Sequence, residues 1–442
     1  MPTNRDSSPC RRVPDEAARQ AGASLMRKST LITIALLGLI VAVAGVVGST
    51  WAPRSTGPAR IDAVKTFSQR LDEAQVRAMS TAQWVAVARD NSIVVLNSWD
   101  FRLIPVLKRA NPKVQIWVYK DLSGIRSDDC TTRSGDCGSC GPGVADSDYL
   151  SSGLGYCWVR RNHPDWLLAT RGSGQPLRFR GYRQTWETDY GNPAYQRQWV
   201  RDVLADIHVH GWDGVEIDNA LTRADAYGVA AKYPSDAAVQ AATFSALKTI
   251  GPALHAAGVA SVFNVGYATL FPQLWQRWLS PVDGLEQEFY LSYSTRPNAV
   301  GTAWSAYEDE VSSCAARHKS CWFHTGEYST AVTSQTRTYA LASYLLATDG
   351  HQFLAVGDTG PETLQPRLVL GARVSVMYQT GAIWRRYFTG GIAVTNPSAS
   401  TSIVSLGGTY VGGNGRPVTT LNLRPASGAV LRIDQDPPVG QR

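Results

Sequence analysis

Short apolar runs of strand length alternate with longer segments of helical periodicity over most of this chain. The predicted strands span residues 92–99, 114–122, 184–190, 212–218, 261–267, 282–291, 320–328 and 351–358. Between them, the apolar spacing predicts helices that include 102–110, 194–210, 236–257 and 335–347. A repeated alternation of strands and helices is typical of a mainly parallel sheet.

Eight such units favour a closed barrel over an open sheet, because a (β/α)8 barrel needs about 250 residues and these units occupy a similar length. An open doubly wound sheet usually carries a Gly-rich phosphate loop after its first strand, and residues 97–100 contain no glycine. We therefore predict an α/β fold, a TIM barrel over residues 86–380. The third strand has the least support from the pattern, because the insertion at 123–183 contains four cysteines and little periodicity.

Both ends of the chain differ from this pattern. Residues 381–442 are rich in Gly, Thr and Val with short alternating runs, which predicts a small antiparallel β-sandwich. Residues 31–49 include an uninterrupted apolar run long enough for a single transmembrane helix. Residues 1–30 are basic and are predicted to stay in the cytoplasm by the positive-inside rule, while 50–85 form a stem. A signal anchor is favoured, and a cleaved signal peptide is the alternative; both place the rest of the chain outside the cytoplasm, on or beyond the cell membrane.

Charge and cysteine content agree with an exported protein. The net charge is +7, but +3 of it lies before residue 31, and the +4 that remains is too small to indicate a nucleic-acid partner. Six of the seven cysteines follow the apolar run, as expected in an oxidising compartment. Cys314 and Cys321 are expected to pair, whereas the four at 130, 137, 140 and 157 leave their connectivity open. A zinc site at the CxxC of Cys137 and Cys140 is the alternative.

The sequence HGWDGVEIDNA at 210–220 carries the first sign of chemistry. Glu216 and Asp218 are two residues apart in a predicted strand, so they share one face. Because burying an unpaired carboxylate is costly, the two acids indicate a site at the end of that strand. The alternative is that Asp218 caps the next helix or pairs with an arginine.

Reactive residues of TIM barrels lie at the carboxyl ends of the strands. The polar residues at those ends are expected to bind substrate or take part in catalysis: Asp121, Glu216, Asp218, Asn219, Asn264, Glu286, Glu288, His324 and Glu327. The sequence has no GxSxG, HExxH or Walker motif, so it lacks the usual signs of serine hydrolase, zinc peptidase or nucleotide chemistry. No metal and no organic cofactor is expected.

Two carboxylates across an aromatic-lined mouth are typical of glycoside hydrolysis, in which one donates a proton and the other attacks carbon or activates water. We assign Asp218 as nucleophile or base, since its short side chain beside Asn219 favours ionisation. We assign Glu288 as the acid, since the apolar Phe289 and Tyr290 raise a carboxyl pKa. Five aromatic residues are candidate sugar platforms: Trp99, Tyr119, Trp186, Tyr267 and Tyr290.

Other roles stay open for several of these residues. Glu216 and Glu286 lie deeper on their strands, where acids commonly bridge to Arg or Lys. Glu288 is alternatively a substrate ligand, with Glu327 as the acid. His324 is alternatively a packed histidine of the barrel wall.

Several motifs resemble one family: DGVEIDN at 213–219, DGLEQEFY at 283–290, and a carboxyl-terminal run that includes WRRYFTGGIAVTNPS at 384–398, with SLGGTY and SGAVL after it. The chain resembles the hypothetical glycoside-hydrolase-like barrels of bacterial secreted proteins, from about residue 86 to its end. That resemblance implies a barrel followed by a sandwich, with Asp218 and Glu288 as the catalytic pair. The cysteine-bearing insertion departs from the family's compact outline.

The expected function is a membrane-anchored, outward-facing glycoside hydrolase acting on a cell-envelope or extracellular polysaccharide or oligosaccharide. Two alternatives remain: a non-catalytic carbohydrate-binding or wall-organising barrel, and a transglycosylase that uses the same two acids.

Overall fold

The computed structural model describes residues 60–61, 64–130, 140–293, 296–326, 332–357, 370–412 and 415–433. The predicted basic segment at 1–30, the transmembrane helix at 31–49 and Glu327 lie outside these residues. No helix in the described part combines the length and the apolar character that crossing a membrane requires.

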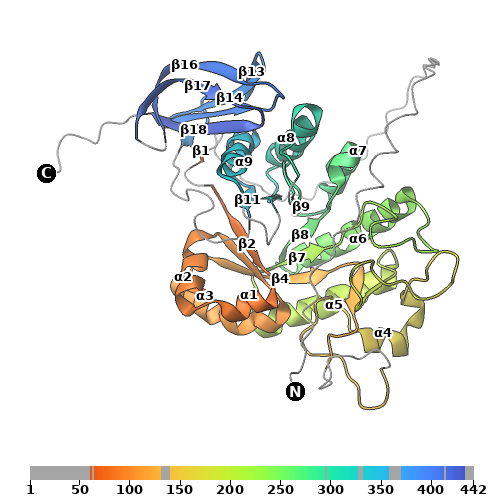
Figure 1. Cartoon of the computed structure of the whole chain (residues 1–442). Helices are drawn as coiled ribbons and strands as arrows, with labels where there is room; N and C mark the ends of the chain where they lie inside the picture. Colours follow the sequence, from red (N-terminus) through yellow and green to blue (C-terminus); the bar gives the residue numbers. More distant parts are fainter. Residues whose placement is uncertain are drawn as a thin grey trace, which may run out of the picture. The chain divides into compact units, whose positions relative to one another are not determined.

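Eight parallel strands form a barrel in which neighbouring barrel strands follow one another in chain order, with the separate β5–β6 pair between β4 and β7 (Figure 1). They are β2 (Phe67–Arg70), β3 (Ile93–Leu96), β4 (Gln115–Asp121), β7 (Gly214–Asp218), β8 (Ala260–Asn264), β9 (Gly284–Gln287), β10 (Trp322–Thr325) and β11 (Phe353–Val356). The barrel closes where Thr66 bridges Leu354 in parallel, and the Leu354 amide donates to the Lys65 carbonyl at 3.0 Å. The predicted eight-stranded parallel barrel is confirmed.

Helices connect the strands: α1 (Glu73–Ala78), α2 (Thr81–Asp90), η2 (Ser98–Leu103), α3 (Ile104–Ala110), α5 (Pro193–His210), α6 (Asp236–Ala256), η4 (Ala268–Leu270), α7 (Pro272–Trp278), α8 (Gly301–Ala316) and α9 (Ser334–Ala347). Helix α5 shows how the sequence sets such bounds. Asn192 caps its start. Pro193 has a φ suited to a helix, and it lacks the N–H that would have no partner within the helix at this first position. Gly211 ends the helix at φ 75°. The four helices predicted from periodicity are confirmed within two residues at nearly every end.

The interior of the barrel changes character along its axis. Inward positions near the amino ends of the strands are apolar and form one cluster, which includes Phe67, Ile93, Val95, Trp117, Val262 and Trp322. Further along the barrel strands, the inward positions are polar: Gln69, Tyr119, Glu216, Asn264, Glu286 and His324. The polar half therefore lies toward the carboxyl ends of the strands.

One predicted strand is wrong and one was missed. The stretch at 184–190 contributes β6 (Thr185–Glu187), which pairs antiparallel with β5 (Gly124–Arg126) inside the insertion, beside α4 (Tyr156–Asn162) and η3 (Pro164–Trp166). The missing barrel strand is β2, within the predicted stem, so the barrel begins before residue 86. Its sequence, FSQR, has a single apolar residue, and its inward Gln69 donates to the buried Glu286 instead of joining an apolar core.

The carboxyl-terminal strands form one antiparallel sheet in the order β13-β14-β15-β18-β16-β17. Their bounds are β13 (Tyr378–Thr380), β14 (Ile383–Phe388), β15 (Gly391–Asn396), β16 (Ser402–Val411), β17 (Pro417–Leu423) and β18 (Ser427–Ile433); β12 (Gly371–Ala372) pairs instead with β1 (Arg60–Ile61). Side chains of five strands enclose an apolar cluster of their own, and β15 and β18 pack on α9 (Figure 1). The antiparallel strands predicted for the β-sandwich are confirmed, and hydrogen bonds join all six into one sheet.

Cysteine pairing is partly as expected. Cys314 and Cys321 form the predicted disulfide. Cys140 pairs with Cys157, and Cys130 is disulfide-bonded as well. The alternative of a zinc site is wrong, because it needs a free thiolate at Cys140.

Candidate active site

A pocket of about 420 Å³ opens at the carboxyl ends of the barrel strands. Its walls come from the strand ends, from the insertion and from the loop after β7. It is lined by Leu71, Asn97, Tyr119, Asp121, Arg126, Ser151, Phe179, Tyr182, Thr185, Glu216, Asp218, Asn219, Tyr227, Asn264, Glu288 and Tyr293. This size and this mixture of polar and aromatic groups suit one or two sugar rings.

Asp218 is the last residue of β7, and three donors hold its carboxylate. Oδ2 accepts a hydrogen bond from the Tyr119 hydroxyl at 2.7 Å. Oδ1 accepts one from the Asn219 amide at 2.7 Å and one from Asn264 Nδ2 at 3.0 Å. Burial raises the pKa of Asp218, and these three hydrogen bonds oppose that rise. The bonds therefore favour an oriented, ionised carboxylate.

The backbone at Asn219 supports this arrangement. Asn219 adopts φ 57°, a left-handed conformation that asparagine tolerates better than most residues. Its side chain bridges two walls of the pocket, since Nδ2 donates to Asp121 at 2.8 Å and Oδ1 accepts from Tyr227 at 2.8 Å. Asp121 in turn accepts the amides of Ser123 and Gly124 and so fixes the turn after β4. The left-handed conformation of Asn219 thus directs its backbone N–H toward the Asp218 carboxylate.

Glu288 directly follows β9 and is partly exposed in the same pocket. Asn264 Nδ2, which donates to Asp218, also donates to Glu288 Oε2 at 3.1 Å. Because one nitrogen binds both acids at 3.0 and 3.1 Å, the two bonded oxygens lie no more than about 6 Å apart. Side chains on strands β7 and β9 are thus brought together across β8.

Glu216 and Glu286 lie one inward position below these two acids and are almost fully buried. Burial raises the pKa of both well above the usual range; Asp218 raises that of Glu216 further, and Glu216 raises that of Glu286 further. The two carboxyl groups influence each other, and their raised pKa values favour the protonated form at this depth. Their partners are Gln69 and one another, not the Arg or Lys of the sequence-based alternative.

The structure brings some of the predicted site residues together and not others. Tyr119, Asp121, Glu216, Asn219 and Asn264 line the pocket with Asp218 and Glu288. The pocket lining does not include Trp99, Trp186, Tyr267, Tyr290, Glu286 or His324.

Three of the residues that do not line the pocket are held by other contacts or buried elsewhere. Tyr290 turns into the core behind the barrel, where its hydroxyl donates to Glu308 at 2.7 Å, so it is no sugar platform. Trp186 stacks against Tyr156 within the insertion. His324 is buried inside the barrel, and burial lowers its pKa to about 4. Neutral and enclosed, His324 fits the alternative of a packed histidine.

An aromatic wall was missed by the sequence analysis. Phe179 and Tyr227 stack with ring centroids 4.0 Å apart, and Tyr182 meets Tyr227 edge-on at 5.8 Å. Two of these residues come from the insertion and one from the loop after β7, neither of which has a periodic pattern. The only signal was the position of the insertion, directly after a barrel strand whose end carries Asp121.

The acid pair at the mouth agrees with a family model that matches residues 108–392, described as hypothetical glycosyl hydrolase family 15. The chain belongs to this family. The resemblance expected from the sequence motifs is thereby confirmed, and the match covers most of the barrel and the first strands of the carboxyl-terminal sheet. No curated protein matches this member of the family in sequence.

The solved structures similar to this family member include glycoside hydrolases of low sequence identity. The glycoside hydrolase domain of PelA from Pseudomonas aeruginosa is 11% identical, with a TM-score of 0.40, covering 72% of this chain and 98% of its own. The maltogenic α-amylase AmyB from Thermotoga neapolitana is 10% identical, with a TM-score of 0.47 and coverages of 84% and 98%. Ega3 from Aspergillus fumigatus, in complex with galactosamine, is 11% identical, with a TM-score of 0.39 and coverages of 69% and 95%.

Proposed function

We propose that this protein hydrolyses O-glycosidic bonds in a polysaccharide, with Asp218 as nucleophile and Glu288 as acid and base. The observation that supports this assignment is the shared donor: Asn264 Nδ2 hydrogen bonds to both carboxyl groups at the open end of the barrel. Membership of a glycosyl hydrolase family agrees with this reaction class. The two acids face one pocket from different strands, as a pair acting on one linkage must.

The reaction takes place in two steps. Asp218 attacks the anomeric carbon while the Glu288 carboxyl gives its proton to the leaving oxygen, so that a C–O bond to Asp218 replaces the glycosidic bond. Glu288, now a carboxylate, then removes a proton from water, whose oxygen attacks the same carbon and releases Asp218. The anomeric configuration is retained.

The spacing of the acids supports retention over inversion. Inverting enzymes place a water between carboxyl groups roughly 6.5–9.5 Å apart, whereas retaining enzymes keep them roughly 5–5.5 Å apart. The bonded oxygens of Asp218 and Glu288 are within about 6 Å of each other, which leaves little room for an intervening water.

The substrate in this proposal is a cell-envelope or extracellular polysaccharide. In the aromatic wall, Tyr182 and Tyr227 offer ring surface for stacking, with the buried Phe179 stacked on Tyr227, and the exposed Tyr182 extends the wall to the rim. The apolar run at 31–49 would hold the enzyme at the outer surface of the cell membrane. Disulfides such as Cys140–Cys157 and Cys314–Cys321 agree with an oxidising location.

The test is a screen of the purified protein against bacterial wall and capsular polysaccharides, with Asp218→Asn as the inactive control. Release of reducing ends by the wild type and not by the variant supports hydrolysis, and proton NMR of the first product gives its anomeric configuration. Wild-type binding without turnover on every polymer would favour the non-catalytic alternative. Longer products formed in the presence of acceptor sugars would favour the transglycosylase.

A further inference from the structure

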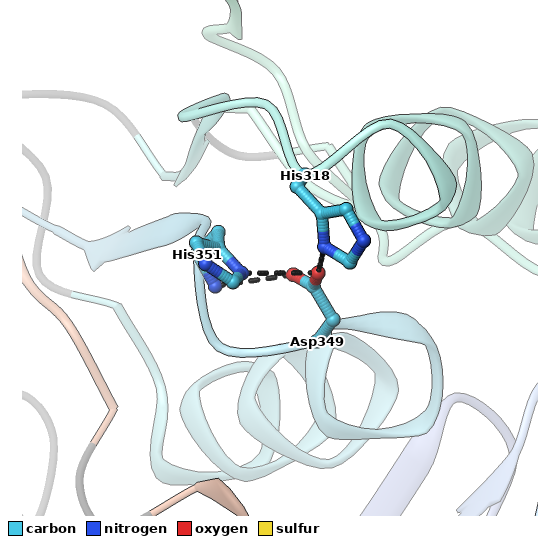
Figure 2. Close-up of side chains that lie close together, drawn as sticks. All are labelled: His318, Asp349 and His351. Atoms are coloured by element: carbon cyan, nitrogen blue, oxygen red, sulfur yellow. Dashed lines mark hydrogen bonds and ion pairs between the residues drawn. The ribbon is translucent and has the colours of Figure 1, made fainter. Parts of the chain in front are cut away.

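We propose that His318, Asp349 and His351 bind one divalent transition metal ion of the zinc class, at the end of the barrel opposite the active site. His318 lies in the loop before β10, and Asp349 and His351 lie in the loop before β11. Both loops are therefore at the amino ends of neighbouring strands. Figure 2 shows the two imidazoles approaching one carboxylate from these separate loops.

Asp349 is the fixed member of the cluster. Its side chain is only 2% exposed, yet it accepts hydrogen bonds from both histidines. Oδ2 lies 2.6 Å from His318 Nδ1 and 3.0 Å from His351 Nδ1, while Oδ1 accepts the His351 amide at 3.1 Å. The last bond closes a tight turn that holds Asp349 and His351 on the same side.

His318 is held separately, by covalent and backbone constraints. The disulfide Cys314–Cys321 closes the short loop that carries it. Within that loop, His318 has φ 51°, and its amide donates to the Ala315 carbonyl at 3.1 Å. Little conformational freedom of the backbone is left to lose on binding an ion, which favours affinity.

The donor set determines the class of metal. Two imidazole nitrogens and one carboxylate oxygen lie within 4.8 Å of one another. Imidazole suits zinc, nickel or copper, whereas magnesium and calcium prefer oxygen ligands alone. Three protein ligands leave a fourth position for water, and the exposed fractions of 70% and 48% for the two histidine side chains keep that position open to solvent.

The observed spacing needs a small adjustment. Ligand atoms about 2.0–2.1 Å from zinc in a tetrahedron are roughly 3.3 Å apart. His318 Nδ1 at 2.6 Å and His351 Nδ1 at 3.0 Å from Asp349 Oδ2 are closer, because hydrogen bonds now join them. Metal binding would release the Nδ1 protons and move each exposed imidazole outward by less than an ångström. The ion would then join two loops of the barrel floor without touching the reacting atoms.

The experiment is a titration of the untagged, metal-free full-length protein with Zn²⁺ followed by calorimetry, and with Co²⁺ followed by its visible absorption. We expect one saturable site with a tetrahedral Co²⁺ spectrum, and no equivalent binding of Mg²⁺. His318→Ala and His351→Ala should each weaken binding at least about tenfold. Zn²⁺ should also raise the melting temperature of the wild type and not that of either variant.

His255→Ala is the matched control. His255 is exposed and its Nδ1 lies 2.8 Å from Asp283 Oδ1, so it is a histidine–aspartate pair without the second imidazole. This variant should bind Zn²⁺ as the wild type does. Circular dichroism without metal verifies that the variants are folded. Absence of a one-to-one site in the wild type, or undiminished binding by folded His318→Ala, would overturn the proposal and identify the cluster as a metal-free hydrogen-bond clasp.

Discussion

Two pairs of acids lie on the same two strands of the barrel, and they differ by a single inward position. Asp218 and Glu288 are at the mouth, partly exposed and in contact with donors. Glu216 and Glu286 are one step deeper, with exposed fractions of 1% and 0%, and burial raises the pKa of both well above the usual range. The comparison teaches that depth along a barrel strand decides how far burial raises the pKa of a carboxyl group, since burial acts on both deep acids, whereas three hydrogen-bond donors oppose it at Asp218.

Replacing the mouth acid on β7 tests the comparison most strongly. Asp218→Asn should lower kcat by about 10⁴-fold or more, because the covalent step loses its nucleophile while the three donors remain. Initial rates on the best polysaccharide from the screen measure this loss. A variant within tenfold of the wild type would remove Asp218 from the reaction.

Replacing Glu288, the mouth acid that follows β9, should lower activity by a smaller factor, which depends on the substrate. Glu288→Gln should lower kcat about 10²- to 10⁴-fold on a polysaccharide, because the leaving oxygen no longer receives a proton. An aryl glycoside with an acidic phenol needs no such proton, so its first step should be spared. If both substrates lose activity equally, Glu288 is a substrate ligand, as in the alternative assignment.

Tyr119→Phe removes one donor from Asp218 without changing the shape of the pocket. A hydrogen bond to a charged group contributes about 1.5–3 kcal/mol, so kcat/KM should fall about 10- to 100-fold. The Tyr119 bond lowers the pKa of Asp218, and its loss should raise that pKa. Because the nucleophile must be ionised, the acid limb of the pH profile should move to higher pH. An unchanged limb would mean that a different group controls it.

Replacing an acid of the deep pair, Glu216 and Glu286, should change the stability of the protein more than its activity. Glu286→Gln should change kcat by less than about tenfold, since burial raises the pKa of Glu286 and so favours the neutral form that glutamine resembles. Burial raises the pKa of Glu286, so the folded wild type holds a proton that the unfolded chain releases at lower pH, and its stability falls as the pH rises through that interval. Each pKa unit by which the folded and unfolded proteins differ changes the free energy of unfolding by about 1.36 kcal/mol across that pH interval.

Urea unfolding of Glu286→Gln and the wild type at pH 5 and pH 9 measures the deep-pair effect. The variant should gain stability relative to the wild type at pH 9. A difference that does not change with pH would show that Glu286 is ionised in the folded protein, and the two pairs would then be electrostatically alike.

Much of the fold was predictable because periodicity records burial. Strands such as β3, β4, β8 and β11 carry apolar runs, and α5, α6 and α9 have capping residues at their starts. Strand β2 is not predicted by the pattern because one of its two inward residues is Gln69, which donates a hydrogen bond to the buried Glu286. The segment at 184–190 was misread because an antiparallel pair within a loop has the same local composition as a barrel strand.

The candidate site was predictable where the residues lie on strands. Asp218, Asn264 and Glu288 follow from the spacing of two residues along a face and from the rule that barrel sites lie at carboxyl ends. Tyr227 and Tyr182 were not predictable, because aperiodic loops bring them to the mouth. Tyr290 shows the converse, since the backbone leaves the strand after Gln287 and turns that ring into the core.

The sequence by itself determined the parallel barrel, the antiparallel unit after it, the Cys314–Cys321 disulfide and the two acids at the mouth, because local periodicity and spacing encode each of them. Only the tertiary structure decided that one amide nitrogen of Asn264 bridges Asp218 and Glu288, that Glu216 and Glu286 lie buried against each other, and that two histidines from separate loops meet at Asp349. Those features depend on distances between residues far apart in the chain, and closure of the barrel sets those distances.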